Sequence, residues 1–340
     1  MSISSPPVPD IDVICRERLG RPALSVDRIG AGRNSRVFRV VLADETVVVK
    51  FYRHDAGDTR DRMATEFGAL RFLWDNGERA VPRAIADDRD RFCAIYEHID
   101  GEAPDLAGIT TGDVDALVDF LARLQALRTK PRSATMGPAS EASFSLAAVA
   151  THVATRADRL RQSAGDDPRV RRWFDESFDP LMREVGEWYG PVAERAQQGM
   201  NAELDRARRT LSPSDFGFHN AIRRQDGSLA FVDFEYFGWD DPAKTIVDFL
   251  LHPGMTLSET LKRRFADRFL EAFAFVPGLA ARARIVYPMF GLKWCLILLN
   301  DFLPDRATTA SDDVRAAQLA KATALVERIG REYRDNPLLA

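Results

Sequence analysis

The 340-residue sequence has few cysteines and no excess of positive charge, and these absences exclude several classes of protein. Its three cysteines, Cys15, Cys93 and Cys295, are far apart and form no CxxC pair, which argues against a zinc site or a disulfide framework. With 47 basic and 51 acidic residues the formal net charge is −4, so we expect no nucleic-acid partner.

Long apolar runs and an apolar leader are also missing. The first residues, MSISSPPVPD, contain no basic region followed by an apolar run, so we expect no signal peptide. The most apolar stretch, residues 287–303, is interrupted by Lys293 and is expected to be too short to span a bilayer. The sequence therefore predicts no membrane insertion and a reducing, cytoplasmic setting.

The hydrophobic period changes along the chain from β-like to helical. Between residues 22 and 99 short β-rich runs alternate with turns, and VFRVVLADETVVVKFY predicts an antiparallel hairpin. Residues 63–74 have a helical period that stops at Asn76-Gly77, and the helical period dominates from residue 112 onward. A β-rich island at residues 210–242 interrupts it. We therefore expect an α+β protein with an extension (1–24), a small β-rich lobe (25–99) and a larger helical lobe (100–340).

The β-rich island concentrates acidic and amide side chains. Asp215 and Asn220 lie five residues apart, and Asp233 follows Asn220 by thirteen. The segment between them reads as strand, turn at Asp226-Gly227 and strand, so a hairpin would bring Asp233 back beside Asn220. Such oxygen ligands suit Mg²⁺, and Asp215, offset from the pair, is placed to accept a proton from an attacking hydroxyl. Taken singly, each residue is more often a turn former or a strand-end cap.

Upstream residues form a candidate phosphate-binding set. Gly30, Gly32 and Ser35 precede the first predicted hairpin, where backbone amides can approach a phosphate, and no Walker motif follows. Lys50 ends the apolar run TVVVK. Glu66 lies at the edge of the apolar face of the next helix and points inward, which predicts an ion pair that directs Lys50 toward phosphates. The same residue types are common in ordinary turns and at solvated strand ends. The prediction of a phosphate-binding set therefore depends on the order of these residues along the chain.

This order resembles that of protein kinases and, in its details, the aminoglycoside phosphotransferase and choline kinase family. SPSDFGFHNAI (212–222) is similar to the family's H-G-D-x-x-x-x-N loop, and FVDFEYFGWDDPAKTIVDFL (231–250) is similar to its I-D-[WF]-[DE]…G-D-P-x-x-D-L segment. Glu235 and Asp248 fall in acid positions of that segment. Pro213 and Ser214 stand where the family usually has His-Gly. No Ala-Pro-Glu motif follows, as it would in a protein kinase.

The resemblance implies a bilobal, protein-kinase-like fold: a small antiparallel-sheet lobe with one main helix, and a mostly helical lobe that carries a catalytic β hairpin. It implies ATP and Mg²⁺ as cofactors. Lys50, held by Glu66, would bind the α- and β-phosphates, Asn220 and Asp233 would hold Mg²⁺, and Asp215 would orient and deprotonate the acceptor hydroxyl. Residues 96–101 would form the hinge between the lobes, with the backbone of Glu97 and Ile99 at the adenine edge.

The activity implied is phosphoryl transfer from ATP to a hydroxyl of a small molecule that is aminoglycoside-, amino-alcohol- or sugar-like. A sugar or lipid-linked glycan kinase is an alternative, and a nucleotide-binding pseudokinase or scaffold is another. The scaffold is the weaker hypothesis because no member of the set is missing. Acceptor specificity is expected in residues 140–209 and the C-terminal helices. We expect Asp248 to brace the catalytic loop, and His219 to pack within it rather than to take part in catalysis.

Overall fold

The computed structural model of the chain describes residues 10–30, 35–53, 60–164, 166–304 and 310–339. Two compact units interleave along the sequence. The first comprises Met1–Asp105, Ala126–Ser140 and Pro213–Gly238, and the second comprises Leu106–Gln125, Glu141–Ser212 and Trp239–Ala340. The lobe boundaries at residues 24 and 99 stay predictions.

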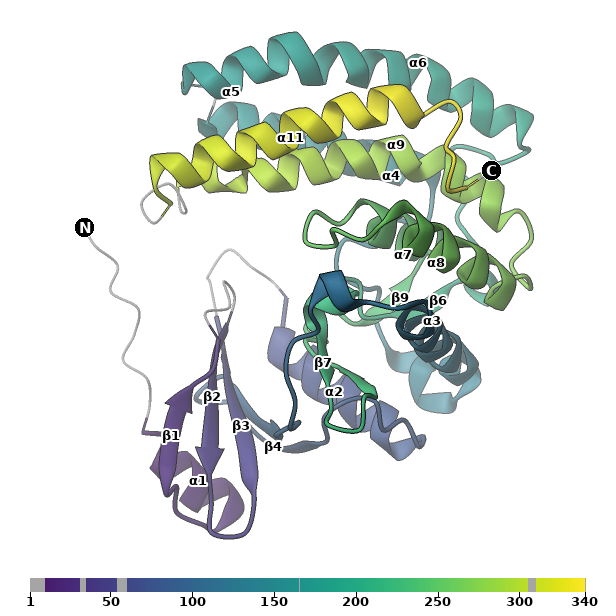
Figure 1. Cartoon of the computed structure of the whole chain (residues 1–340). Helices are drawn as coiled ribbons and strands as arrows, with labels where there is room; N and C mark the ends of the chain where they lie inside the picture. Colours follow the sequence, from purple (N-terminus) through teal and green to yellow (C-terminus); the bar gives the residue numbers. More distant parts are fainter. Residues whose placement is uncertain (1–9, 31–34, 54–59, 165, 305–309, 340) are drawn as a thin grey trace. The chain divides into compact units, whose positions relative to one another are not determined.

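The first unit contains a five-stranded antiparallel sheet with the strand order β1-β2-β3-β5-β4 (Figure 1). The strands are β1 (Ser25–Arg28), β2 (Ser35–Val41), β3 (Thr46–Tyr52), β4 (Ala84–Asp88) and β5 (Cys93–Glu97). The predicted hairpin is β2 and β3, paired from Ser35↔Tyr52 to Val41↔Thr46. Its alternating β-branched residues bury one face, which fixes the register and so the position of Lys50 on β3.

A short N-terminal helix, α1 (Ile11–Leu19), completes the core beside this sheet. Ile11, Ile14 and Cys15 are buried in one cluster with side chains of β2, β3 and β5. Asp10 caps the helix by accepting from the N–H of Asp12, and Gly20 ends it in the left-handed conformation. Part of the predicted extension is therefore core structure, and the sequence analysis did not identify this helix.

Two further elements of the first unit carry residues of interest. Helix α2 (Arg62–Asp75) ends just before Asn76-Gly77, as its pattern predicts. The predicted hairpin of the β-rich island is β7 (Ala221–Arg223) with β8 (Leu229–Phe231). Its turn contains Gly227 at φ +84°, and the N–H of Val232 donates to the carbonyl of Asn220 at 2.9 Å. This hydrogen bond extends the pairing of the two strands to Val232, the residue before Asp233.

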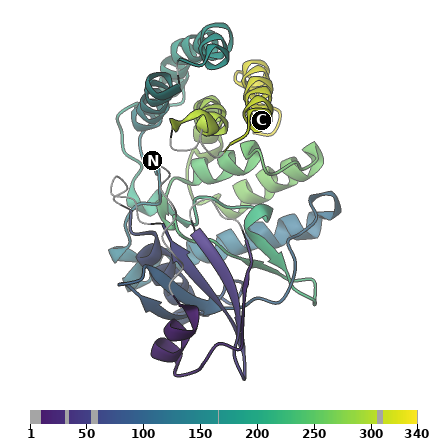
Figure 2. The same ribbon diagram turned by 90° about the vertical axis from the view of Figure 1, so that its left-hand side faces the viewer.

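The second unit is mostly helical, as the helical period predicts. Helices α4, α6, α9 and α11 run side by side in Figure 1 and are seen nearly end-on in Figure 2. Its helices are α3 (Thr111–Ala126), α4 (Leu146–Ala164), α5 (Pro168–Trp173), α6 (Asp179–Arg195), α7 (Pro242–Leu251), α8 (Glu259–Ala272), α9 (Leu279–Leu298) and α11 (Asp312–Glu332). The short strands β6 (Thr210–Ser212) and β9 (Gly238–Asp240) pair with each other.

Helix α9 corrects one expectation from the sequence. With the turn that follows, it spans Leu279–Phe302, which is long and apolar enough to cross a membrane, so the predicted short span was wrong. Of its apolar window 83% is buried inside the structure, as in the central helix of a globular core. At Gly291 an added Cβ would lie 2.4 Å from Cδ1 of Ile329, so this glycine permits the close approach of α11.

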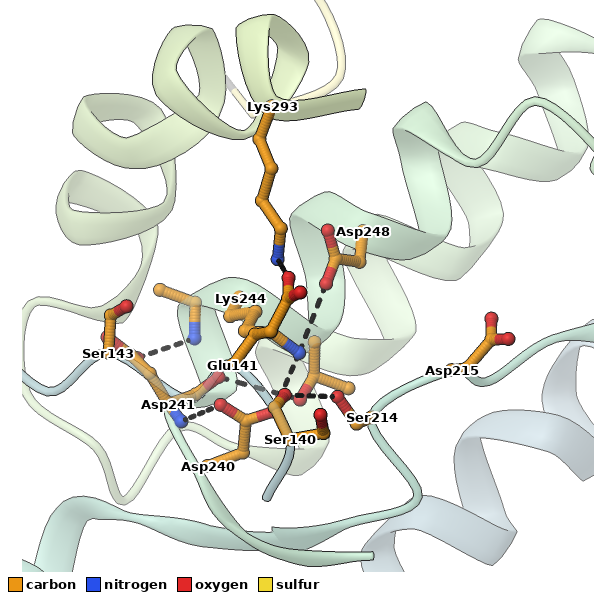
Figure 3. Close-up of polar contacts among 12 residues, drawn as sticks. Ser140, Glu141, Ser143, Ser214, Asp215, Asp240, Asp241, Lys244, Asp248 and Lys293 are labelled. Carbon is orange, nitrogen blue, oxygen red and sulfur yellow. Dashed lines mark hydrogen bonds and ion pairs between the residues drawn. The ribbon is translucent and has the colours of Figure 1, made fainter. Parts of the chain in front are cut away.

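A buried ionic network links α7 and α9 of the second unit to neighbouring segments (Figure 3). Lys244 Nζ lies 2.8 Å from an oxygen of Asp240 and 3.2 Å from one of Asp248, and the indole of Trp294 donates to Asp248 at 2.9 Å. Asp248 therefore pairs with α7 and α9 in this unit; its predicted action on the catalytic loop stays a prediction.

Glu141 belongs to the same ionic network and has a strained backbone conformation. Its φ is +57°, an unusual value for a residue other than glycine, and its carboxylate pairs with Lys293 at 2.8 Å and with Arg156. Burial would raise the pKa of Glu141, but Lys293 and Arg156 outweigh it and lower the pKa to about 2.

This pKa shift predicts a pH dependence of stability. A carboxylate whose pKa is lower in the folded than in the unfolded state stabilises the fold above pH ~4.5 and loses this contribution as the pH falls toward ~2. The parent should therefore lose more unfolding free energy than Glu141→Gln between pH 5 and 2, measured by urea unfolding. Glu187→Gln, on the exposed side of α6, is the control. If the unfolding free energies of the parent and of Glu141→Gln fell equally between pH 5 and 2, the prediction would be contradicted.

Candidate active site

The first unit brings three of the predicted residues into direct contact. Lys50 Nζ on β3 lies 2.7 Å from a carboxylate oxygen of Glu66 on α2 and 2.7 Å from one of Asp233. The carboxylate of Glu235 is 3.8 Å from the same ammonium group and 3.6 Å from Arg62. Burial would lower the pKa of Lys50, but Glu66 and Asp233 outweigh it and hold the pKa above its ordinary value. The lysine is thus a fixed positive charge.

Glu66 connects this lysine to two other residues of the first unit. Its Oε2 accepts from Lys50 and from the hydroxyl of Tyr52 at 2.8 Å, and its Oε1 accepts from the N–H of Phe234 at 3.2 Å. Burial raises the pKa of Glu66, and the nearby ammonium of Lys50 opposes that rise. One buried side chain therefore ties α2 to β3 and to the residue that follows Asp233.

Two tyrosines extend the network toward the predicted hinge. The hydroxyls of Tyr52 and Tyr96 are 2.6 Å apart. Because a carboxylate only accepts, Tyr52 must donate to Glu66, so its oxygen is left to accept from Tyr96. Burial and the charge of Glu66 raise the pKa of both phenols, which keeps them protonated donors at neutral pH.

This order of donors predicts unequal effects of two similar substitutions. Tyr52→Phe removes a hydrogen bond to a buried carboxylate and also takes away the acceptor of Tyr96, so we expect a loss of about 2–3 kcal/mol in unfolding free energy. Tyr96→Phe leaves the bond to Glu66 intact and should cost about 1 kcal/mol. Urea unfolding of both variants measures the difference. Equal losses would contradict the donor order.

The loop before the hairpin places the other predicted residues. Asp215 precedes the turn Phe218–Asn220, and its side chain is 39% exposed. The amide nitrogen of Asn220 donates to the main-chain oxygen of Asp215 at 3.0 Å, which leaves the amide oxygen of Asn220 directed elsewhere. His219 Nε2 lies 2.9 Å from Oδ1 of Asp215. This contact lies within the loop in which His219 is expected to pack.

Ser214 explains how the loop accommodates its departure from the family motif. Its φ is +69°, in the left-handed region that favours glycine, at the position where the resemblance gives glycine. The Ser214 hydroxyl donates to the carbonyl of Ser140 at 3.0 Å (Figure 3). A side-chain hydrogen bond thus helps to offset the backbone strain immediately before Asp215.

Substitutions at Ser214 should separate strain from hydrogen bonding. Ser214→Ala keeps the strained backbone and loses the bond to Ser140, so we expect a loss of about 1 kcal/mol in unfolding free energy. Ser214→Gly loses the same bond but relieves a strain of about 1 kcal/mol, so its stability should stay closer to the parent's. Thermal unfolding measures both. A glycine variant less stable than the alanine variant would refute the strain argument.

The remaining predicted nucleotide-binding residues are placed in part. Gly30 has φ +126° and Ser35 begins β2 opposite Tyr52, whereas Gly32 lies outside the described residues. The N–H of Glu97 donates to the carbonyl of Arg83 at 2.9 Å, so a ligand would have to use other backbone atoms of the hinge. Ile99 is buried. The roles of these residues stay predictions.

Gly101 fixes the course of the predicted hinge. It has φ +156°, and an added Cβ would lie 2.2 Å from the main-chain oxygen of Arg223 on β7. The next residue, Glu102, bridges Arg223 with a donated and an accepted hydrogen bond. Only glycine allows the hinge backbone to approach the hairpin this closely.

The donor set fits a divalent cation. Oxygens of Glu66, Asp233 and Glu235 lie within 4.8 Å of one another, and three carboxylates against two cationic side chains, Lys50 and Arg62, leave one excess negative charge. Among the described residues, Oδ2 of Asp233 and the amide oxygen of Asn220 accept no hydrogen bond. Asp233 has φ +66°, a strained conformation that directs it out of the strand path.

The chain is similar to proteins of a known family over most of its length. A model of the "Phosphotransferase enzyme family" matches residues 25–285, which is more than half of the chain. The chain belongs to this family. Its membership confirms the predicted phosphotransferase activity class, and no curated protein matches the sequence.

Solved structures similar to this phosphotransferase confirm the predicted α+β kinase-like fold. Spectinomycin phosphotransferase APH(9)-Ia, in complex with ADP and spectinomycin, has a TM-score of 0.67 at 11% identity, covering 95% of this chain and 97% of that one. Choline kinase from Cryptosporidium parvum Iowa II has a TM-score of 0.60 at 14% identity, with coverages of 96% and 94%. The gentamicin-APH(2")-IIa complex has a TM-score of 0.61 at 16% identity, with coverages of 96% and 97%.

Proposed function

We propose that this phosphotransferase transfers the γ-phosphoryl group of ATP, with Mg²⁺, to a hydroxyl of a small molecule. The observation that carries the proposal is the contact of Lys50 with both Glu66 and Asp233, next to a hairpin that pairs Asn220 with the residue before Asp233. A phosphoryl transfer site needs fixed positive charge for phosphate, oxygen ligands for a metal and a base for the hydroxyl. Residues of these three kinds converge in one unit.

Each residue has a distinct part in the proposed reaction. Lys50, fixed by Glu66, binds phosphate oxygens, and its displacement from Asp233 frees that carboxylate. Asn220 and Asp233 would hold Mg²⁺, which when bound neutralises charge on the phosphates. Asp215 orients the acceptor hydroxyl and takes its proton as the acceptor oxygen bonds to the γ-phosphorus. The bond from that phosphorus to the bridging oxygen breaks, and ADP leaves.

The acceptor class comes from the similar structures. The names of those proteins give spectinomycin, gentamicin and choline as their ligands or substrates, which are all hydroxyl compounds with amine or quaternary ammonium nitrogens. We therefore propose an aminoglycoside-, amino-alcohol- or sugar-like acceptor, recognised by residues of the second unit between 140 and 209 and by its C-terminal helices. A cytoplasmic enzyme is consistent with the presence of ATP as donor.

A coupled assay of ADP release tests the proposal. The purified protein is incubated with Mg·ATP and with panels of aminoglycosides, amino alcohols, sugars and nucleosides, and products are identified by mass. Asp233→Asn is the matched variant because asparagine also tolerates positive φ but lacks the charge for Mg²⁺. We expect the parent to release ADP when a suitable acceptor is present. Asp233→Asn should lose this acceptor-dependent release. Nucleotide binding without transfer to any acceptor would support a scaffold instead.

A further inference from the structure

The loop around Asp215 contains an interaction that the proposed reaction leaves unexplained. His219 Nε2 lies 2.9 Å from Oδ1 of Asp215, and the histidine side chain is only 20% exposed. A carboxylate only accepts hydrogen bonds, so Nε2 carries the proton and donates it. The contact therefore defines the histidine nitrogen that donates and the aspartate oxygen that it occupies.

The loop does not depend on this contact for its conformation. The amide nitrogen of Asn220 donates to the main-chain oxygen of Asp215, and the N–H of Asn220 donates to the carbonyl of Gly217 at 3.1 Å. The hydroxyl of Ser214 donates to Ser140. Three bonds outside the carboxylate thus hold the backbone on both sides of Asp215, whereas the histidine contacts its side chain.

We propose that His219 is a positioning residue that holds the Asp215 carboxylate in one rotation, so that its other oxygen meets the acceptor hydroxyl. An aspartate carboxylate has a broad torsional minimum about its last bond, and a base is effective only within hydrogen-bond reach of the proton it takes. A donor fixed on Oδ1 removes this rotational freedom. The inference rests on the proposed function, since it assigns a purpose to Asp215 as base.

The chemistry of the transfer is unchanged by this assignment. The acceptor O–H bond breaks as its proton passes to Asp215, the acceptor oxygen bonds to the γ-phosphorus, and ADP leaves. His219 neither gains nor loses a proton in this step. Its contribution is to the orientation of the base, so it should affect turnover and leave nucleotide binding unchanged.

Variants of His219 that differ in the reach of their donor test the proposal. The amide nitrogen of glutamine can take the place of Nε2, whereas that of asparagine corresponds to Nδ1 and is too short. We expect His219→Ala and His219→Asn to lower kcat about 10- to 100-fold at unchanged affinity for Mg·ATP, and His219→Gln to recover most of the loss. Arg16→Ala, which removes the partner of Asp12 four residues away on α1, is the control and should keep parental turnover.

A double-mutant comparison separates positioning from a structural role. If His219 acts through Asp215, His219→Ala should cost nothing further in an Asp215→Asn background. Equal costs in the two backgrounds, or recovery by asparagine as good as by glutamine, would overturn the assignment while the parent still transfers phosphate. A parent that transfers phosphate to no acceptor would instead overturn the proposed function and this assignment with it.

Discussion

Asp215→Asn is expected to lower the turnover of acceptor by about 10²–10⁴-fold while affinity for Mg·ATP stays close to that of the parent. The amide has nearly the same shape as the carboxylate, and its oxygen still accepts from His219, so the side chain should keep its orientation. What the variant loses is the ability to take a proton from the acceptor hydroxyl. Nucleotide affinity, melting temperature and turnover at saturating acceptor are measured on the same preparation.

The same substitution in the turn of the following hairpin provides the control for Asp215. Asp226 lies at the exposed turn, where its carboxylate accepts from the N–H and the hydroxyl of Ser228. Asp226→Asn should retain parental turnover. If Asp215 were only a turn residue, asparagine would serve equally well there, and the Asp215 variant would behave like the Asp226 variant. Near-parental turnover of Asp215→Asn would therefore remove the main reason for assigning it as the base.

The parts of the site that the sequence predicts are those fixed by local periodicity. The helical phase of Glu66 directs it inward, and the strand-turn-strand pattern after Asn220 returns the chain to Asp233. Both inferences need only the geometry of a single element or of one tight turn. The contact of Lys50 with Glu66 follows once the strand and the helix pack on each other.

The parts that the sequence does not predict depend on contacts across the fold. Tyr52 and Tyr96 are 44 residues apart, and no local pattern marks either as a partner of Glu66. The left-handed backbone of Ser214 leaves no signal in a residue type that is common in loops. The contact of His219 with Asp215 was not predicted for another reason. The two residues are four apart, but a loop has no regular geometry that would turn this spacing into a contact.

Lys244→Met should be the most destabilising of the substitutions considered, with a loss of about 3–5 kcal/mol in unfolding free energy. Lys244 is 2% exposed and Asp240 is fully buried, and the two are paired at 2.8 Å. Burial would lower the pKa of Lys244, but Asp240 and Asp248 outweigh it and hold the pKa above its ordinary value. Methionine preserves length and volume, so the variant loses the charge and creates no cavity.

The pH dependence of the Lys244→Met variant distinguishes lost charge from poor packing. Burial already raises the pKa of Asp240, and removal of Lys244 should raise it further. An acid whose pKa is raised in the folded state destabilises that state above the pKa and ceases to do so below it, so the variant should recover stability relative to the parent as the pH falls from 8 to 5.

Lys262→Met on α8 is the matched control for Lys244→Met. Lys262 is 8% exposed, and burial lowers its pKa, but Glu259, with which it forms an ion pair at 3.7 Å, is exposed. A buried ammonium with so weak a partner adds little to stability, so this variant should unfold within about 1 kcal/mol of the parent at every pH. A loss in Lys244→Met that is equally small, or that does not change with pH, would mean that the carboxylate of Asp240 is already neutral in the folded protein, and its pairing with Lys244 would then be a hydrogen bond without ionic character.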